Sequence, residues 1–222
     1  MKVVHLNKKR TTGRRIRDSL TFPLRAVTLF HEDKWGLSSQ ASERFDYVAR
    51  EVKGYCLDIG CGYHNRFVSE WLGGHGVGID VYQYAGLASD QIVTDMTHLP
   101  FQDGSFDSVT FIANLNHVPR SIRDLELAEA HRCLRSNGNI VVTMGNPLAE
   151  IAVHKVVALY DRFFGTHVDM DTERGMGDEE AYYLLDREIV SRLQKAGFSK
   201  LDKKYFWTQW GLNHLWVGWK LP

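Results

Sequence analysis

Short apolar runs alternate along this chain with stretches in which apolar residues recur every three or four positions. The runs predict buried strands at residues 55–59, 76–79, 91–93, 109–112 and 140–144. The helical spacing is clearest before the first run, where Phe45, Val48 and Val52 share one face. Strands that alternate with helices form a mostly parallel sheet with helices on both faces.

The carboxyl-terminal part of the chain shows a different pattern. Residues 203–208 and 215–219 read as two strands joined by a loop around Gly211, with no helical pattern between them. They predict an antiparallel hairpin. We therefore expect one α/β domain over residues 41–222: a doubly wound, Rossmann-like sheet of seven strands, mostly parallel, that ends in this antiparallel hairpin.

A glycine turn follows the first predicted strand. Gly60 and Gly62 flank Cys61, and apolar residues at helical spacing come directly afterwards. In a strand, turn and helix of this kind, backbone N–H groups face a ligand, and a residue without Cβ lets the ligand lie against the main chain. About twenty residues after Gly60, the second run ends in Asp80, whose carboxylate is an acceptor for a ribose diol. The pattern predicts a ligand that contains a nucleoside.

The details of the turn distinguish between nucleosides. A dinucleotide fingerprint requires a third glycine where this chain has Asn65. The pattern Asp58-x-Gly60-Cys61-Gly62 instead resembles the first motif of class I S-adenosylmethionine-dependent methyltransferases, in the small-molecule branch similar to those of ubiquinone and menaquinone biosynthesis. The chain departs from that family at His64, where many members have a glycine. Other family-like motifs follow in order at Thr94-Asp95-Met96, Leu99-Pro100-Phe101, residues 105–109, a helix end at residues 129–138, and Ala196-Gly197-Phe198.

The resemblance implies that the cofactor is S-adenosylmethionine and suggests where it binds. The glycine turn would hold the methionine part, with Asp58 ordering the turn, and Asp80 would hold the ribose. Asp95, Met96 and the residue after Asp80 would contact the adenine. The cofactor-binding residues implied are Asp58, Gly60, Cys61, Gly62, Asp80, Val81, Asp95, Met96 and Asn114.

The loop after residues 109–112 is where chemistry is expected. In a doubly wound sheet, the carboxyl ends of the first and fourth strands flank the ligand crevice. Asn114 and His117 would then lie beside the sulfonium. His117 is a candidate general base or substrate ligand, and the alternative is a histidine that only shapes the pocket wall. Methyl transfer often requires only orientation of the nucleophile, so both interpretations stay open.

The acceptor and its atom are not encoded in a recognisable motif. The chain lacks the Asn-Pro-Pro-aromatic signature of amino-group methylation of nucleic acids and the Pro-Cys nucleophile of pyrimidine methylation. We expect methylation of a small molecule at oxygen, nitrogen or carbon. The alternatives are an RNA methyltransferase, a non-catalytic nucleoside-binding module and a nicotinamide-dependent dehydrogenase, the last disfavoured by Asn65.

Composition narrows the setting. The 222 residues are 44% hydrophobic and 24% charged, as in an ordinary globular protein. Three cysteines, Cys56, Cys61 and Cys133, are an odd number, and two of them lie in or beside the predicted buried strand at residues 55–59. This does not indicate a disulfide framework, and it fits a cytoplasmic protein. No apolar run predicts a membrane span or a signal peptide.

The charge is unevenly distributed although the net charge is zero. Residues 1–17 contain seven Lys and Arg residues and no acid, which leaves 20 basic against 27 acidic residues in the rest. A basic arm on an acidic body could contact RNA or an anionic membrane. We expect instead a solvated, partly ordered tail, within an amino-terminal segment, residues 1–40, that could fold over the cofactor through His31 and Trp35.

Residues 148–184 match the family least. As an insertion after the fifth predicted strand, they are expected to form a wall or lid over the substrate. His167, Asp169 and Asp171 alternate and would share one face of an extended segment, which is one way to hold a metal. Acidic loops are usually solvated, so we expect no metal here.

Overall fold

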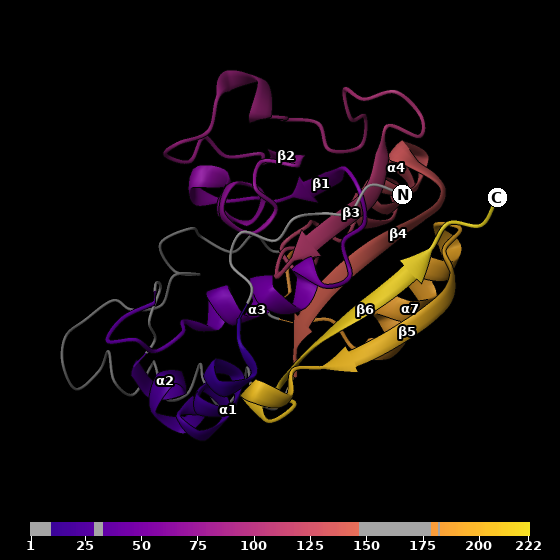
Figure 1. Ribbon diagram of the computed structural model, residues 1–222. Helices are drawn as coiled ribbons and strands as arrows, with labels where there is room; N and C mark the ends of the chain where they lie inside the picture. The colour runs from indigo at the N-terminus through magenta and orange to yellow at the C-terminus, as the bar shows by residue number, and fades with distance from the viewer. Residues whose placement is uncertain (1–9, 29–32, 147–178, 182) are drawn as a thin grey trace.

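The computed structural model of the chain describes residues 10–28, 33–146, 179–181 and 183–222 (Figure 1). Within these ranges, the protein is built around a single mixed sheet of six strands in the order β2-β1-β3-β4-β6-β5. Their bounds are β1 Cys56–Ile59, β2 Gly76–Ile79, β3 Phe106–Ile112, β4 Leu134–Gly145, β5 Ser199–Tyr205 and β6 Asn213–Trp219.

The sheet is doubly wound, as the sequence predicts. β1 pairs in parallel with β2 on one side and with β3 on the other, and β3 pairs in parallel with β4. β6 is antiparallel to both β4 and β5, which confirms the carboxyl-terminal hairpin. From β1, successive strands are added first on one side (β2) and then on the other (β3 and β4), so β1 is the topological switch point. The carboxyl ends of β1 and β3 lie next to each other there.

The predicted seventh strand at residues 91–93 is wrong. These residues lie beyond the end of β2, and the only β-type pairing that they make with other described residues is a single bridge between Asp80 and Ile92. The backbone N–H of Asp80 donates to Gln91 (2.9 Å) and that of Val93 donates to Asp80 (2.9 Å). Residues Ser89–Gln91 form a 3-10 helix, so too little extended chain remains for a strand.

Helices cover both faces of the sheet (Figure 1). α3 (Gln40–Ala49) packs on one face, and α4 (Arg123–Cys133) and α7 (Asp186–Lys195) pack on the other. β4 shows how the strands serve both cores, because Val141 faces the α3 side while Ile140 and Val142 face the α4 side. This alternation has the period of two that a strand requires.

Two helical segments differ from the prediction. α4 does not continue to Gly138 but ends at Cys133, and β4 begins at the next residue. Asn137 and Gly138 instead pair with Lys220 near the carboxyl terminus (2.9 and 3.0 Å). After the first strand, the expected helix is a 3-10 turn, Tyr63–Asn65, followed by a short π-helix, Phe67–Trp71.

The amino-terminal segment is helical from residue 12, which corrects the expected tail for residues 10–17. α1 (Thr12–Leu20) and α2 (Phe22–Thr28) pack beside η4 (Trp207–Gln209), the short turn between β5 and β6 (Figure 1). The Arg10 guanidinium is buried and donates to Asp18 at 2.9 Å. Residues 1–9 lie outside the described residues, as does His31, and Trp35 is 84% exposed.

Candidate functional site

The carboxyl ends of β1 and β3 are joined by a close contact between Gly60 and Asn114. Gly60 has a φ of +75°, and a Cβ at this position would lie 2.3 Å from the Asn114 amide. The Asn114 Nδ2 donates to the carbonyl of Ile59 at 3.2 Å. The space left by the missing Cβ of Gly60 is therefore filled by Asn114, so Gly60 does not leave room there for a ligand.

Gly62 is the open glycine of the turn. Its φ is +63°, and a Cβ built there would meet nothing within 4 Å. Its N–H donates to Oδ2 of Asp80 at 3.0 Å. The other oxygen of Asp80 accepts the N–H of Tyr82 at 3.0 Å, and the side chain is buried. The Asp80 carboxylate thus links the glycine turn to the end of β2. It lies beside the main chain of Gly62, which no other side chain covers within 4 Å of the Cβ position.

Asp58 is bonded within the sheet. The Thr110 hydroxyl on β3 donates to Asp58 Oδ1 at 2.6 Å. Burial, together with the nearby Asp80 charge, raises the pKa of Asp58 to about 7 although the Thr110 bond opposes the shift. Near neutral pH, this carboxyl is therefore partly protonated. Burial also raises the pKa of the Cys61 thiol, which remains protonated.

His64, the departure from the family pattern, adopts the conformation that a glycine favours. Its φ is +59°, in the left-handed region. The chain accommodates the imidazole at a second glycine, because a Cβ on Gly86 would lie 2.2 Å from His64 Nδ1. The N–H of His64 donates to Ala85 at 2.9 Å, which holds the turn against this loop.

The residues expected at the adenine are less tightly gathered. Asp95 is exposed and accepts the N–H (2.9 Å) and the hydroxyl (2.6 Å) of Thr97, and these hydrogen bonds lower the pKa of Asp95. Met96 is buried in the core on the α4 side. Val81 is 42% exposed at the end of β2. The structure thus brings Gly60, Gly62, Asp80 and Asn114 together, while Asp95 caps a turn.

His117 has a carboxylate partner that the sequence did not reveal. Glu180 Oε2 lies 3.3 Å from His117 Nδ1, and both side chains are mostly buried. Backbone bonds hold the two segments together, since Ala181 donates to Asn116 (2.9 Å) and Arg120 donates to Glu179 (3.1 Å). Glu180 lies 63 positions away in the segment with least family resemblance, so no local pattern connects it with His117.

A further buried acid on α4, Glu126, interacts electrostatically with Asp80. Burial raises the pKa of Glu126 to about 8, with the charge of Asp80 adding to the shift and that of Arg123 opposing it. Together with Asp58, it makes the surroundings of Asp80 rich in carboxyl groups of raised pKa. Such groups favour a positively charged ligand, because the cation offsets the cost of ionising them.

Two negative findings apply to the described residues. Among them, no three His, Cys, Asp or Glu side chains are arranged to hold a metal ion, and His167, Asp169 and Asp171 lie outside these ranges. The helices in these ranges include none that is long and apolar enough to cross a membrane. The three cysteines, Cys56, Cys61 and Cys133, are buried free thiols.

Comparisons with known proteins agree with the fold and the turn. Residues 57–142 match the methyltransferase domain family. A ubiquinone/menaquinone biosynthesis C-methyltransferase of Rhizobium johnstonii is 29% identical over 132 residues, which cover 55% of this chain and 48% of that protein. The chain spans about half the length of the curated relatives that it matches.

Solved structures extend the similarity across the fold. The 1,6-didemethyltoxoflavin-N1-methyltransferase of Burkholderia thailandensis, solved with bound S-adenosylhomocysteine, has a TM-score of 0.56 at 16% identity and covers 98% of this chain and 94% of its own. The [4+2]-cyclase SpnF has a TM-score of 0.57 at 16% identity and covers 100% and 99%. At these identities the likeness concerns the fold alone, and a fold does not fix a reaction.

In fold and in motif order, the chain resembles the class I S-adenosylmethionine-dependent methyltransferases. Within that class, it is similar to the ubiquinone/menaquinone biosynthesis C-methyltransferases.

Proposed function

We propose that this protein binds S-adenosylmethionine at the carboxyl ends of β1 and β2 and transfers its methyl group to a small molecule. The observation that carries the proposal is the arrangement of Gly62 and Asp80. An open main chain without Cβ lies directly against a buried carboxylate whose two oxygens already accept N–H groups 3.0 Å away. Such an acceptor suits two adjacent ribose hydroxyls.

The residues of the turn fit this cofactor. The methionine part would lie along Gly62, with Cys61 beside it, and the adenine would lie between Val81 and the segment of Asp95 and Met96. Asp58 and Glu126 suit the positive charges of the sulfonium and the amino group, since a nearby cation favours the ionised form of a buried carboxyl. Asn114 would lie at the mouth between the glycine turn and the substrate side.

S-adenosylmethionine, when bound, supplies a methyl group activated by a positively charged sulfur. The chain contributes position, because a nucleophile held in line close to the methyl carbon gains much of its rate from proximity. His117 would take the proton of a substrate hydroxyl or acidic carbon. Glu180 would accept the Nδ1–H of His117, which leaves Nε2 as the basic nitrogen and stabilises the imidazolium that forms.

A small-molecule acceptor is favoured over RNA. The relatives are named as quinone-biosynthesis C-methyltransferases, and the toxoflavin enzyme likewise acts on a small molecule. Apart from residues 1–17, the chain has more acids than bases, whereas a surface that binds RNA is usually basic.

The proposal is tested by mass spectrometry of the purified protein under native conditions. A co-purifying or added S-adenosylmethionine or S-adenosylhomocysteine is expected to raise the mass by one ligand. Capture of NAD and not of either adenosyl compound would contradict the proposal and favour the dehydrogenase.

A further inference from the structure

The two amino-terminal helices bury two charged side chains and expose several apolar ones. Asp18 on α1 is 0% exposed and Arg25 on α2 is 1% exposed. By contrast, Leu20 is 77% exposed and Leu24 is 58% exposed, and Ile16 one turn before Leu20 is 51% exposed. A helix on a globular body normally turns its apolar side to the core, so this reversal needs a physical cause.

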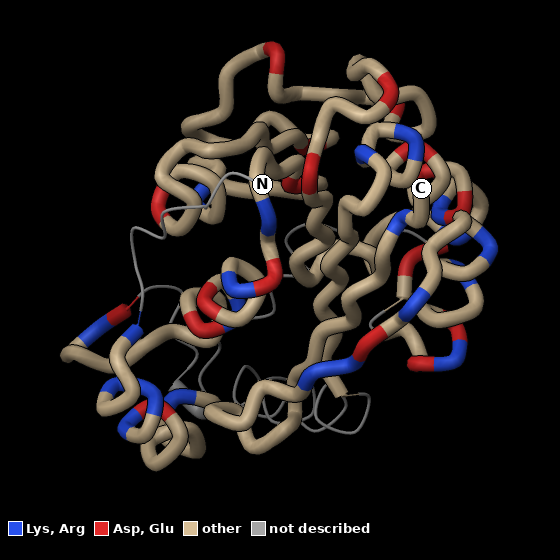
Figure 2. Tube along the Cα trace, turned by 45° about the vertical axis from the view of Figure 1, so that its right-hand side comes forward, with Lys and Arg blue, Asp and Glu red and all other residues tan. Residues whose placement is uncertain are grey.

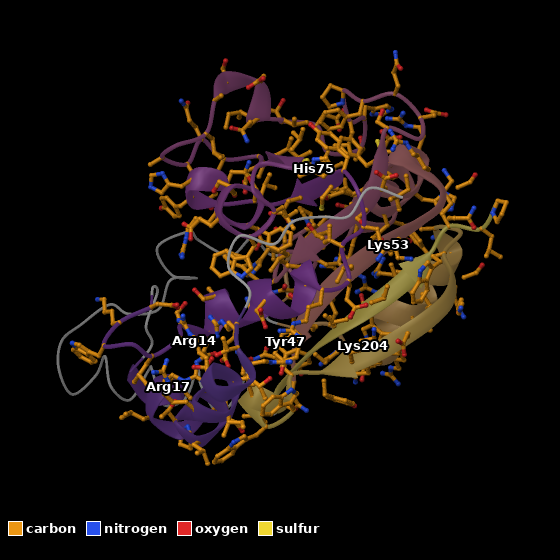
Figure 3. The ribbon with its side chains drawn as sticks, in the orientation of Figure 1. Arg14, Arg17, Tyr47, Lys53, His75 and Lys204 are labelled. Atoms are coloured by element: carbon orange, nitrogen blue, oxygen red, sulfur yellow. The ribbon has the colours of Figure 1, made fainter. Side chains whose placement is uncertain are left out.

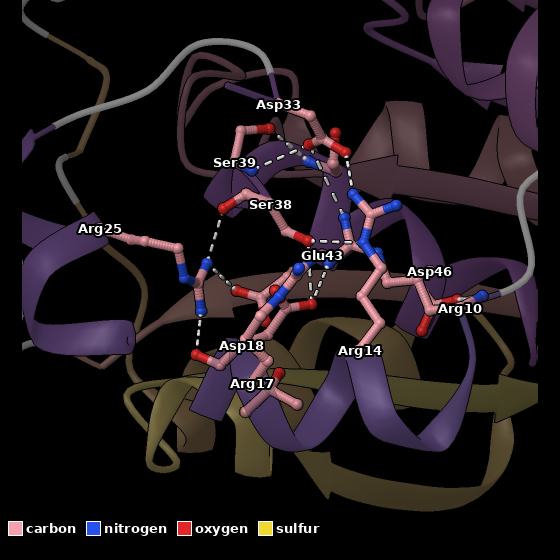
Figure 4. Close-up of polar contacts among 12 residues, drawn as sticks. Arg10, Arg14, Arg17, Asp18, Arg25, Asp33, Ser38, Ser39, Glu43 and Asp46 are labelled. Atoms are coloured by element: carbon pink, nitrogen blue, oxygen red, sulfur yellow. Dashed lines mark hydrogen bonds and ion pairs between the residues drawn. The ribbon is translucent and has the colours of Figure 1, made fainter. Parts of the chain in front are cut away.

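The cause is a network of buried ion pairs beneath the helices (Figure 4). The Arg25 guanidinium lies 2.8 Å from Glu43 on α3 and also donates to the carbonyl of Ser38 (2.8 Å). Arg10 pairs with Asp18 at 2.9 Å, and Ser38 donates to the same carboxylate at 2.9 Å. Rotating α1 would take Asp18 away from buried Arg10, and rotating α2 would take Arg25 away from buried Glu43. Either partner would then be a buried charge without its counter-ion, which is strongly unfavourable. The outward position of the leucines is therefore fixed.

The turn between β5 and β6 extends the apolar surface. Trp210 is 60% exposed, and its Nε1 donates to the carbonyl of Ser19 at 3.0 Å, which joins the turn to α1. Its ring also contacts buried Phe22, with the ring centroids 5.8 Å apart. We call these exposed side chains of α1, α2 and the turn the amino-terminal apolar surface: Ile16, Leu20, Leu24, Trp207, Trp210 and Leu212.

Basic side chains accompany this surface. Arg17 and Lys34 are exposed, and Arg14 is partly exposed beside Asp33, the one acidic side chain exposed within the described residues from 10 to 40. Figure 3 shows Arg14 and Arg17 together in the amino-terminal helices, away from Lys53 and His75 at the amino ends of β1 and β2. Blue basic segments gather in the same helices in Figure 2. The amino-terminal segment therefore exposes both apolar and basic side chains.

We propose that the amino-terminal apolar surface docks on an anionic lipid bilayer. Aliphatic side chains enter the acyl region, tryptophans favour the interface, and arginines attract acidic headgroups. RNA fits less well, because Ile16, Leu20 and Leu24 offer no hydrogen bonds to bases or phosphates. A second copy of this chain fits less well too, since a symmetric pairing would bring the same positive charges together.

Docking would also orient the candidate site. η4 and Trp210 precede β6, whose first residue, Asn213, pairs with Gly145 at the carboxyl end of β4. The surface therefore lies at the edge of the sheet where the carboxyl ends of β1, β3 and β4 emerge. This binding depends on α1, α2 and the turn alone, so it stands or falls separately from methyl transfer.

The test is flotation of the full chain with vesicles of phosphatidylcholine alone or mixed with phosphatidylglycerol. We expect binding to the mixed vesicles only, and weaker binding as salt is raised. The double variant Leu20→Ser/Leu24→Ser should bind roughly ten- to a hundredfold more weakly. The matched control is Leu125→Ser on α4, where the side chain is 54% exposed outside the surface, and it should bind as the wild type does.

Several outcomes would overturn the proposal. One is failure of the wild type to float with the mixed vesicles, and another is equal loss of binding in Leu125→Ser. Sedimentation that shows a dimer dissolved by Leu20→Ser/Leu24→Ser would make the surface an interface between copies. Binding of single-stranded RNA that this variant abolishes would assign the surface to RNA. The urea-unfolding midpoint of the double variant, measured alongside, should be unchanged and shows that the fold is intact.

Discussion

Gly60 and Asn114 are in close contact where the two strands that flank the candidate site end. A Cβ on Gly60 would lie 2.3 Å from the Asn114 amide, closer than any side chain tolerates. Asn114 in turn donates to the carbonyl of Ile59, the last residue of β1 (3.2 Å). The glycine turn and the loop that carries His117 are therefore positioned by one contact.

Gly60→Ala should lower stability more than its backbone conformation alone explains. Gly74 is the matched control, because its φ of +76° nearly equals the +75° of Gly60, and a Cβ there would meet nothing within 4 Å. Gly74→Ala should cost about 1 kcal/mol for the left-handed conformation. Gly60→Ala should cost a further 1–3 kcal/mol, roughly, from overpacking. Urea unfolding measures both, and Asn114→Ala should relieve the extra cost in the double variant. Equal costs at Gly60 and Gly74 would show that Asn114 moves away freely.

Asp58 should make the protein less stable as pH rises. Its pKa is raised from 3.8 to about 7 by burial, so the folded state holds a proton that the unfolded state releases between these values. The contribution of this group to the free energy of unfolding is fully present below about pH 4. It falls as the pH rises to about 7, by as much as about 4 kcal/mol. Asp58→Asn should remove this dependence, seen as a smaller loss of unfolding free energy between pH 5 and pH 8, approximately. The same slope in the variant would assign it to other groups.

His117 should matter for turnover and not for cofactor affinity. If it acts as a base, His117→Asn should slow single-turnover methyl transfer roughly 10²–10⁴-fold. Glu180→Gln should slow it less and move the rise in rate to lower pH, because the carboxylate favours the protonated imidazole. Glu179→Gln is the control, since Glu179 accepts from Ser121 beside the dyad. A rate that falls equally in both glutamate variants would reduce Glu180 to a structural contact.

The buried pair between Arg25 and Glu43 should be necessary for the amino-terminal helices. Glu43→Ala leaves the Arg25 guanidinium buried without its carboxylate, which should cost about 3–5 kcal/mol. Lys195, which is 71% exposed, pairs with Asp124. Lys195→Ala should therefore lower the free energy of unfolding by at most about 1 kcal/mol. Thermal or urea unfolding distinguishes the two. Similar small losses would mean that the amino-terminal network tolerates an unpaired charge.

The fold was largely predictable because its signals are local. Apolar runs and the glycine turn give β1, β2 and their neighbours, and the strand at residues 76–79 has the observed bounds. The failed strand at residues 91–93 has an apolar run, but among the described residues it forms only a single bridge to Asp80, because β2 ends at Ile79. Pairing depends on where the neighbouring strand ends, which no local pattern shows.

The candidate site was predictable in part for the same reason. Gly62 and Asp80 are separated by fixed motif spacing, and the structure brings them together at 3.0 Å. Glu180 was missed because its relation to His117 is purely tertiary. The amino-terminal helices were misjudged because they are held by buried Asp18 and Arg25, whose ion pairs are tertiary, and a basic sequence without an apolar stripe resembles a solvated tail.

The most direct measurement is calorimetric titration of the wild type and Asp80→Ala with S-adenosylmethionine, with NAD as the comparison ligand. The wild type should bind S-adenosylmethionine and ignore NAD. Loss of a charged acceptor for the ribose should weaken binding by about 1.5–3 kcal/mol, roughly ten- to a hundredfold. Unchanged affinity in Asp80→Ala, or binding of NAD in place of S-adenosylmethionine, would contradict the assignment of this site.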